Sequence, residues 1–473
     1  MPGSPMQLKD PPAPAQASCA PALLSALLLL ATACLPYLQR SMYAAPASAH
    51  LRPRASALRT AAQALALGSA QRSPFTTYSC IAGSQAFTTP WHVFTHNYKE
   101  PSWLGYRMCL VRNVCLVRGV PQFYVDQDLE ARLPPPLRLA SLGAAGFLYR
   151  GPYEATVGEA LAPAIVPGPR PSHLPFAPPG RLYLATSLNN AQNYAHVLLD
   201  TVLPAYSAAD FYGLDIEDVQ HVGLTTCDTF QNHAWVSKGS GASFASACWQ
   251  NFERWYAPLM PHAFLDASAA TAATAAEGMC YDALLLGQDA VFSGAMFGGQ
   301  MSRARAVRAL RARARAAAGL SDVSLPPASA ATLLALQQHQ PVNAATAFPD
   351  LCALVRGGLP AGAGAARVAC SLPGNETVGQ QVRAAGDAAV MVCEHGSTCY
   401  AALFASPGAS VVVLVPRSAP AAKEGHVLLF LPDITVYFVG EDSARERGGA
   451  ELAATLELAW RNAQERMGVG EVA

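Results

Sequence analysis

The segment from residue 388 to residue 415 restricts the possible folds more than any other part of this chain. Ala388–Cys393 and Ser410–Val415 are unbroken apolar runs with the length of buried strands. Between them, residues 394–397 form a predicted tight loop and residues 398–405 a short helix. Two apolar strands joined by a helix within about 28 residues are typical of a βαβ unit in a parallel sheet. We therefore predict an α/β fold.

A second βαβ unit is predicted between residues 181 and 224. Arg181–Thr186 and Val219–Leu224 have the composition of short strands, and the segment between them is predicted to be a helix. Pro204 should bend or end this helix, because proline offers no amide proton and its ring clashes with the preceding turn. Both halves of the chain thus contain the repeating unit of a parallel sheet.

Three polar residues lie on one side of the predicted helix. Asn193, His196 and Asp200 are spaced i, i+3 and i+7, which places them within about 60° of one another around the helix axis. No Lys, Arg or Glu shares this side, so it is not an ordinary solvated face. A carboxylate beside an imidazole suits general acid–base chemistry. The alternative is a structural helix whose His and Asp satisfy buried partners.

The loop after Ala388–Cys393 is the second candidate site. In α/β sheets, ligands bind at the carboxyl ends of strands, and helix N-termini favour phosphate groups. Gly396 would allow close backbone approach, and His395 would donate to a diphosphate. Ser397 and Thr398 would cap the helix and offer hydroxyl groups. The alternative is a turn with a structural histidine.

The N-terminal region predicts a membrane anchor. Ala20–Leu38 is an uncharged apolar run of 19 residues, about the length that crosses a bilayer. Residues 1–19 would be a short tail and residues 39–74, rich in Ala, Ser, Arg and Pro, a stem. A signal peptide cleaved near Ala33 is the alternative. Ten cysteines follow this run and Asn375 begins a glycosylation sequon, so we expect disulfides and a lumenal body.

Composition and missing motifs exclude several classes of function. Hydrophobic residues make up 51% of the chain, charged residues 14%, and the formal net charge is zero. A nucleic-acid partner is therefore not expected, because it would require a basic surface. The chain has no Walker motif, no GxGxxG or GxSxG sequence and no CxxC pair. We expect no metal.

Four segments occur in an order that indicates a family: Arg107–Leu116, Asn193–Pro204, Val378–Val382 and Val390–Val415. Together they resemble family 61 glycosyltransferases, which include xylosyl-, arabinosyl- and N-acetylglucosaminyltransferases of the secretory pathway. The second segment is similar to the family's Asn-x-x-His-x-x-x-Asp-x-x-x-Pro helix. After the His-Gly pair, the family usually continues Ala-Gly-Leu-Thr-Asn, whereas residues 397–401 of this chain are Ser-Thr-Cys-Tyr-Ala.

The resemblance implies two Rossmann-like domains that face a cleft, an arrangement known as GT-B. Residues 75–275 would form the acceptor-side domain and residues 276–447 the nucleotide-sugar side, followed by a C-terminal helix and tail at residues 448–473. The protein would be a single-pass type II protein of the Golgi or endoplasmic reticulum membrane. In the alternative with a cleaved signal peptide, it would be secreted.

The resemblance also implies a reaction. A sugar would pass with inversion from a nucleotide sugar, expected to be a UDP-sugar, to a glycan or glycoprotein acceptor, without a further cofactor. Asp200 or His196 would be the catalytic base and Asn193 would bind substrate, while residues 395–398 would hold the diphosphate. The changed residues 397–401 favour an alternative function, that of a non-catalytic lumenal protein that binds glycans or acts as a chaperone.

Overall fold

The computed structural model describes residues 73–82, 107–132, 163–188, 191, 193–227, 241–267, 278–287, 304–320, 332–336, 351–358, 367–371, 376–415, 428, 431–440 and 449–468. The chain divides into two compact units, 1–57 and 58–473, and all of these residues belong to the second. The predicted anchor at residues 20–38, the cleavage site near Ala33, most of the stem and Asn375 lie outside the described residues. In the described part, no helix is long and apolar enough to cross a bilayer.

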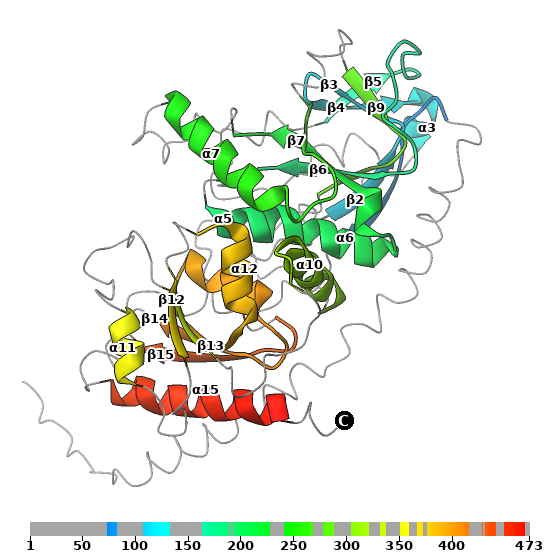
Figure 1. Cartoon of the computed structure of the whole chain (residues 1–473). Helices are drawn as coiled ribbons and strands as arrows, with labels where there is room; N and C mark the ends of the chain where they lie inside the picture. Colours follow the sequence, from blue (N-terminus) through cyan, green and yellow to red (C-terminus); the bar gives the residue numbers. More distant parts are fainter. Residues whose placement is uncertain are drawn as a thin grey trace, which may run out of the picture. The chain divides into compact units, whose positions relative to one another are not determined.

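Five parallel strands form the described C-terminal sheet, in the order β12-β11-β13-β14-β15 (Figure 1). Their bounds are Thr332–Leu336 for β11, Arg367–Ser371 for β12, Ala388–Glu394 for β13, Ser410–Val415 for β14 and Thr435–Gly440 for β15. Because β13 and β14 are parallel neighbours joined through a helix, the predicted βαβ unit is confirmed. Figure 1 shows this sheet between α15 on one side and α12 on the other.

Side chains of this sheet point alternately to its two faces, as the pleat requires. Val390 and Val392 belong to a core cluster that includes residues of α11 (Leu351–Gly357) and α15 (Ala450–Gly468). Met391 and Cys393 belong to a second cluster with α12 (Val378–Gly386) and η12 (Ser397–Phe404). Both faces are therefore buried, which is why β13 and β14 are apolar at every position between their ends.

The N-terminal part contains two described sheets. The larger has six described strands in the order β1-β2-β10-β6-β7-β8, and β10, β6, β7 and β8 run parallel. Its strands are β1 Thr77–Ala82, β2 Arg107–Arg112, β6 Leu182–Ser187, β7 Val219–Thr225, β8 Leu265–Asp266 and β10 Leu284–Leu286. The smaller has the described order β5-β4-β3-β9, with β3 Val114–Val117, β4 Val120–Val125, β5 Ala164–Pro167 and β9 Gly278–Tyr281. The parallel pair β6–β7 confirms the second predicted βαβ unit.

The smaller sheet covers one face of the larger one. Val111 and Leu284 of the larger sheet share a core cluster with Val114 and Phe123 of the smaller sheet. Helices cover the opposite face, so the described N-terminal part is not a sheet with helices on both sides. Strands β9 and β10 also lie beyond the expected domain boundary at 275/276, yet they pair with strands of this N-terminal part. Residues 278–286 therefore belong to the N-terminal sheets, while the domain bounds themselves stay a prediction.

The helix between β6 and β7 is longer than expected. It begins as α5 (Tyr194–His196), continues through the π-helical turn η6 (Val197–Val202) and runs on as α6 (Leu203–Tyr212). Pro204 therefore does not end the helix, and that part of the prediction is wrong. Pro204 instead lies in the first turn of α6. The amide of Leu203 bonds to the carbonyl of Leu198, five residues back. This wider turn accommodates a residue without an amide proton.

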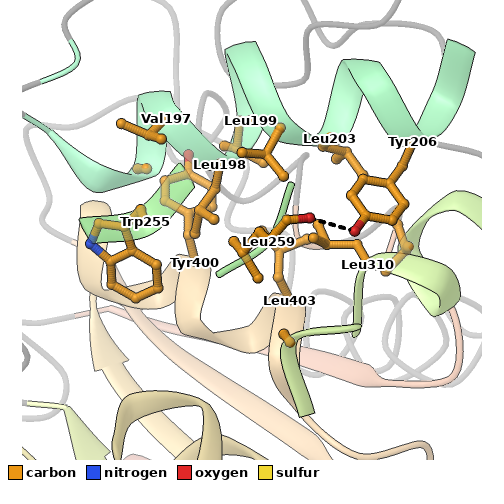
Figure 2. Packing of buried hydrophobic residues seen from close by; sticks show 14 of the residues in the cluster. Val197, Leu198, Leu199, Leu203, Tyr206, Trp255, Leu259, Leu310, Tyr400 and Leu403 are labelled. Atoms are coloured by element: carbon orange, nitrogen blue, oxygen red, sulfur yellow. Dashed lines mark hydrogen bonds between the residues drawn. The ribbon is translucent and has the colours of Figure 1, made fainter. Parts of the chain in front are cut away.

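The helices between the two large sheets share one hydrophobic core. Val197, Leu198 and Leu199 of η6 belong to one cluster with Tyr400 and Leu403 of η12, and all five are almost fully buried. Figure 2 shows Leu198 beside Tyr400. The arginine-rich helix α10 (Ala304–Ala317) packs against both α6 and α12. Two of its exposed arginines form ion pairs: Arg305 with Asp210 of α6, and Arg308 with Asp433, which precedes β15.

Disulfides tie strands to neighbouring elements. Four are formed within the described ranges: Cys115–Cys280, Cys227–Cys248, Cys352–Cys370 and Cys393–Cys399. Cys109 is also disulfide-bonded, and it lies opposite Cys80 in the antiparallel register of β1 and β2. The expected disulfides are therefore present among the described cysteines, although their connectivity was not predictable from the sequence.

A buried histidine makes the stability of the fold depend on pH. His221 of β7 is fully buried and hydrogen-bonds through Nδ1 to the Tyr256 hydroxyl of α7 (Gly241–Tyr256) at 3.0 Å. Burial lowers the pKa of His221 to about 3, opposed only in part by the backbone of Thr201. The unfolded chain takes up this proton near pH 6.5, so unfolding binds a proton at acidic pH.

We predict that the free energy of unfolding falls as the pH decreases below about 6.5, by up to about 1.4 kcal/mol per pH unit from this residue. His221→Asn, whose amide takes the place of Nδ1, should be less stable at pH 7 but should lose less stability between pH 6.5 and 4.5. Urea denaturation of both proteins at several pH values measures the two slopes. Equal slopes would contradict the assignment.

Candidate functional site

Both candidate segments lie where the strand order of a sheet reverses. From β6 the chain proceeds to β7 and β8 on one side, while β10 pairs on the other side. From β11 it proceeds to β12 on one side and to β13 on the other. Ligands of open α/β sheets bind at the carboxyl ends of the strands at such positions. The helix that begins at Tyr194 follows β6, and the loop at His395 follows β13.

His196 and Asp200 form the hydrogen-bonded pair that the helix predicts. Nδ1 of His196 lies 2.7 Å from Oδ2 of Asp200. The carboxylate side chain is 4% exposed and the imidazole 18% exposed, so the imidazole is the outer member of the pair. A carboxylate at Nδ1 fixes the orientation and tautomer of the ring and leaves Nε2 as the nitrogen that exchanges protons. This arrangement can act as a general base.

Asn193 has a structural role that the sequence analysis did not identify. Its backbone is extended, and its side-chain oxygen accepts a hydrogen bond from the amide of Ala195 at 3.0 Å. Asn193 is therefore the N-cap of α5, a position at which asparagine is among the preferred residues. Since Oδ1 already caps the helix, the substrate-binding role predicted for Asn193 would fall to its side-chain NH2 group (Nδ2).

The loop after β13 is held in a conformation that depends on glycine. Gly396 has φ 138° and ψ −168°, a region that residues with a Cβ rarely adopt. The amide of His395 donates to the carbonyl of Leu414 on β14 at 2.8 Å, so the loop leaves the sheet in a fixed direction. The amide of Cys399 makes the first hydrogen bond of the following 3₁₀ helix, to the carbonyl of Gly396. The amides of Ser397 and Thr398 precede this first bond, so they belong to the N-terminus of the helix and do not take part in its internal hydrogen bonding.

Two details of the predicted loop are wrong. The N-cap of η12 is Gly396, and no side chain caps this helix, so neither Ser397 nor Thr398 has the expected capping role. The hydroxyl of Thr398 instead donates to the carbonyl of Glu394 at 3.3 Å and is buried. The loop turns back on the end of β13, and this brings the Thr398 hydroxyl inward. His395, Gly396 and Ser397 are partly exposed.

A disulfide closes the loop into a ring. Cys393 at the end of β13 is bonded to Cys399 of η12, and the five residues between them include all four predicted phosphate contacts. Both cysteines are buried, at 0% and 1% exposure. Sequence reasoning missed this pair, although Cys399 is one of the positions that depart from the family pattern. The six-residue spacing alone was no signal, because Cys109 and Cys115 are also six residues apart and Cys115 is bonded to Cys280 instead.

Tyr194 brings the two candidate segments together. Its hydroxyl donates to the carbonyl of Ser397, although the two residues are 203 positions apart in the sequence. Its ring stacks on Trp255 of α7 with a centroid separation of 5.0 Å, and Trp255 in turn stacks on Phe404 of η12 at 6.1 Å. Tyr194 is not one of the three polar residues of the predicted helix side, so the helical pattern did not predict this contact.

The charged groups of the site are few. Asp200 and Glu394 are buried carboxylates, and Glu394 ends β13 directly before the loop. Glu394 was not among the predicted site residues, although its position directly before His395 already places it in the loop. Among the residues that the structure describes, no group of three His, Cys, Asp or Glu side chains is arranged to hold a metal ion.

We predict that Gly396→Ala destabilises the protein by about 1–3 kcal/mol, since alanine is strained at this φ. Gly379→Ala is the matched control, because Gly379 lies inside α12 and a methyl group there meets Ala318 at 3.9 Å, an ordinary contact. Because Gly379 is the second residue of α12, in the first turn and not in the helix interior, this control should change the stability by less than about 0.5 kcal/mol. Chemical denaturation compares the variants, and a neutral Gly396→Ala would show that the loop adapts.

Comparison with known proteins adds no assignment to this geometry. The sequence matches no protein-family model, and no curated protein matches it significantly.

Proposed function

We propose that this protein is a glycosyltransferase similar to family 61, which transfers a sugar with inversion from a UDP-sugar to a glycan or glycoprotein. The observation that carries the proposal is the contact between the helix of the His196–Asp200 pair and the loop at residues 395–398. These segments come from different sheets, and each follows a strand at a switch point. A two-substrate reaction needs this juxtaposition of a base and an anion-binding loop.

In the proposed reaction, His196 is the base and Asp200 orients it. His196 is the more exposed of the two, and its Nδ1 is already bound to the carboxylate, so Nε2 takes the proton of the acceptor hydroxyl. The hydroxyl oxygen then forms the new bond to the anomeric carbon of the donor sugar. The bond from that carbon to the diphosphate oxygen breaks on the opposite face, and UDP leaves with the electron pair. Asp200 stabilises the imidazolium that forms.

The donor side relies on the backbone more than on charged side chains. The amides of Ser397 and Thr398 at the start of η12, with the imidazole of His395, would bind the diphosphate and stabilise the charge of the leaving group. Gly396 keeps side-chain atoms away from this surface.

The finer architecture is also part of the proposal. We infer two α/β domains in a GT-B-like arrangement, with the acceptor side on the β6–β7 sheet and the donor side on the β11–β15 sheet. The donor-side sheet, which has helices on both described faces, is the Rossmann-like one. We place the body in the lumen of the Golgi or endoplasmic reticulum, held by the anchor at residues 20–38. The disulfides among the described cysteines support an oxidising compartment.

The non-catalytic alternative has one observation in its favour. The hydroxyl of Thr398 is bonded to the carbonyl of Glu394 and buried, so this side chain is directed away from a donor. A protein of this second kind would bind a nucleotide or glycan without turnover.

We predict that His196→Ala and Asp200→Asn each lower kcat by about 100- to 10,000-fold, because the proton of the acceptor is no longer removed. Asp210→Asn is the matched control on the same helix, since Asp210 pairs with Arg305 outside the site. Transfer and hydrolysis assays with a panel of UDP-sugars measure the rates. Full activity of both site variants would contradict the assignment, and UDP binding without turnover in the unmodified protein would favour the alternative.

A second prediction concerns the ring formed by Cys393 and Cys399. Replacing both by alanine should raise the dissociation constant for UDP several-fold, because binding must then order the loop. Replacing Cys227 and Cys248 by alanine should cost more stability, about 3 against about 2 kcal/mol, because that disulfide closes the longer loop. The control should still bind UDP normally. Calorimetric titration with UDP measures the affinity of each double variant, and thermal unfolding measures its stability. An equal loss of UDP affinity in the Cys393/Cys399 and Cys227/Cys248 variants would contradict the role of the ring.

A further inference from the structure

We propose that Tyr194 is a positioning residue that sets the direction of the Thr398 amide. It also couples the loop at residues 395–398, here called the donor loop, to the helix that carries His196 and Asp200, here called the catalytic helix. This role rests on the proposed function of the site. It concerns the contact between the helix and the loop, and the sequence patterns of these two segments did not show which residue makes that contact.

The hydroxyl of Tyr194 acts on one peptide group. It donates to the carbonyl of Ser397, the first residue of η12. In a trans peptide the carbonyl and the following N–H point in opposite directions in one plane. A hydrogen bond that holds the Ser397 carbonyl toward Tyr194 therefore also fixes the Thr398 N–H on the opposite side. That N–H is one of the two amides proposed to bind the diphosphate.

The ring of Tyr194 is itself held firmly. It stacks on Trp255, whose exposed fraction is 1%, with 21° between the ring planes. Trp255 also stacks on Phe404 at the far end of η12, with 7° between the planes. Both ends of η12 are thus linked to Tyr194, at Ser397 through the hydroxyl and at Phe404 through the tryptophan. Rotation of the Ser397–Thr398 peptide would have to break the hydroxyl bond.

This contact also links the two substrates. Tyr194 lies two residues before His196 in the three-residue helix α5, whose N-cap is Asn193. A diphosphate that orders the Thr398 amide therefore orders the Ser397 carbonyl, Tyr194 and the first turn of the catalytic helix. We expect that UDP protects the amides of both segments, although it contacts only the loop.

Tyr194→Phe is the test, with Tyr206→Phe as the matched control. Tyr206 lies on α6, and its hydroxyl also donates to a backbone carbonyl, that of Leu259 at 2.7 Å (Figure 2). Each variant keeps the aromatic ring and loses one hydroxyl-to-carbonyl bond, so similar small decreases in melting temperature are expected. Only the first variant removes a bond to the donor loop.

Hydrogen exchange of the full-length protein without ligand gives the first readout. In Tyr194→Phe, amides of residues 397–404 should exchange several-fold faster, whereas Tyr206→Phe should leave them unchanged. With UDP, the unmodified protein should show protection in both segments, and Tyr194→Phe in the loop alone. Kinetically, Tyr194→Phe should raise the KM for the UDP-sugar several-fold and lower kcat, and Tyr206→Phe should change neither.

The outcomes separate the two hypotheses. If both variants exchange alike at residues 397–404, the positioning role is wrong even where UDP binds. If UDP protects neither segment in the unmodified protein, the proposed function is wrong and this role with it. Faster exchange, a lost second protection and a changed KM in Tyr194→Phe alone support the inference.

Discussion

The helix at residues 194–212 packs against η12, and this contact joins the core of the N-terminal sheet to the core of the C-terminal sheet. Leu198 and Leu199 of the first segment and Leu403 of the second are almost completely buried in one hydrophobic cluster, which also takes residues from both large sheets. Burial of apolar area is the main favourable contribution to such contacts, at roughly 25 cal/mol per Å². Because the helix is apolar on nearly all sides, it needs covering from two directions. Polar groups that share these elements are consequently brought together as well.

The site is a consequence of this packing combined with sheet topology. The helix that carries His196 follows β6, and the loop that carries His395 follows β13, each beside a reversal of strand order. Neighbouring connections diverge to opposite faces at such points and leave room for a ligand. Local constraints then fix the groups themselves: a carboxylate orients His196, and glycine and a disulfide shape the loop. The proposed chemistry draws on side chains for the acceptor and on backbone amides for the donor.

Several expectations failed for identifiable physical reasons. Pro204 does not end its helix, because a π-helical turn precedes it and relieves the clash with the preceding carbonyl. The Thr398 hydroxyl does not cap η12, because the loop turns it toward the end of β13. The N-terminal sheet has a second sheet on one described face, which strand patterns alone do not indicate. The apolar alternation of a strand shows that a face is buried, but it does not show which element covers the face.

The two βαβ units and the pairing of His196 with Asp200 could be predicted from the sequence alone. These features depend on residues close together in the chain, where the periods of strand and helix dictate which side chains are neighbours. Three features could not be predicted in this way and follow from the packing of the folded chain: the partner of Cys393, the π-helical turn and the contact of Tyr194 with Ser397. That contact joins residues 203 positions apart, and its formation depends on how two sheets share a core. Local patterns carry no information about such distances, because many arrangements bury the same apolar faces.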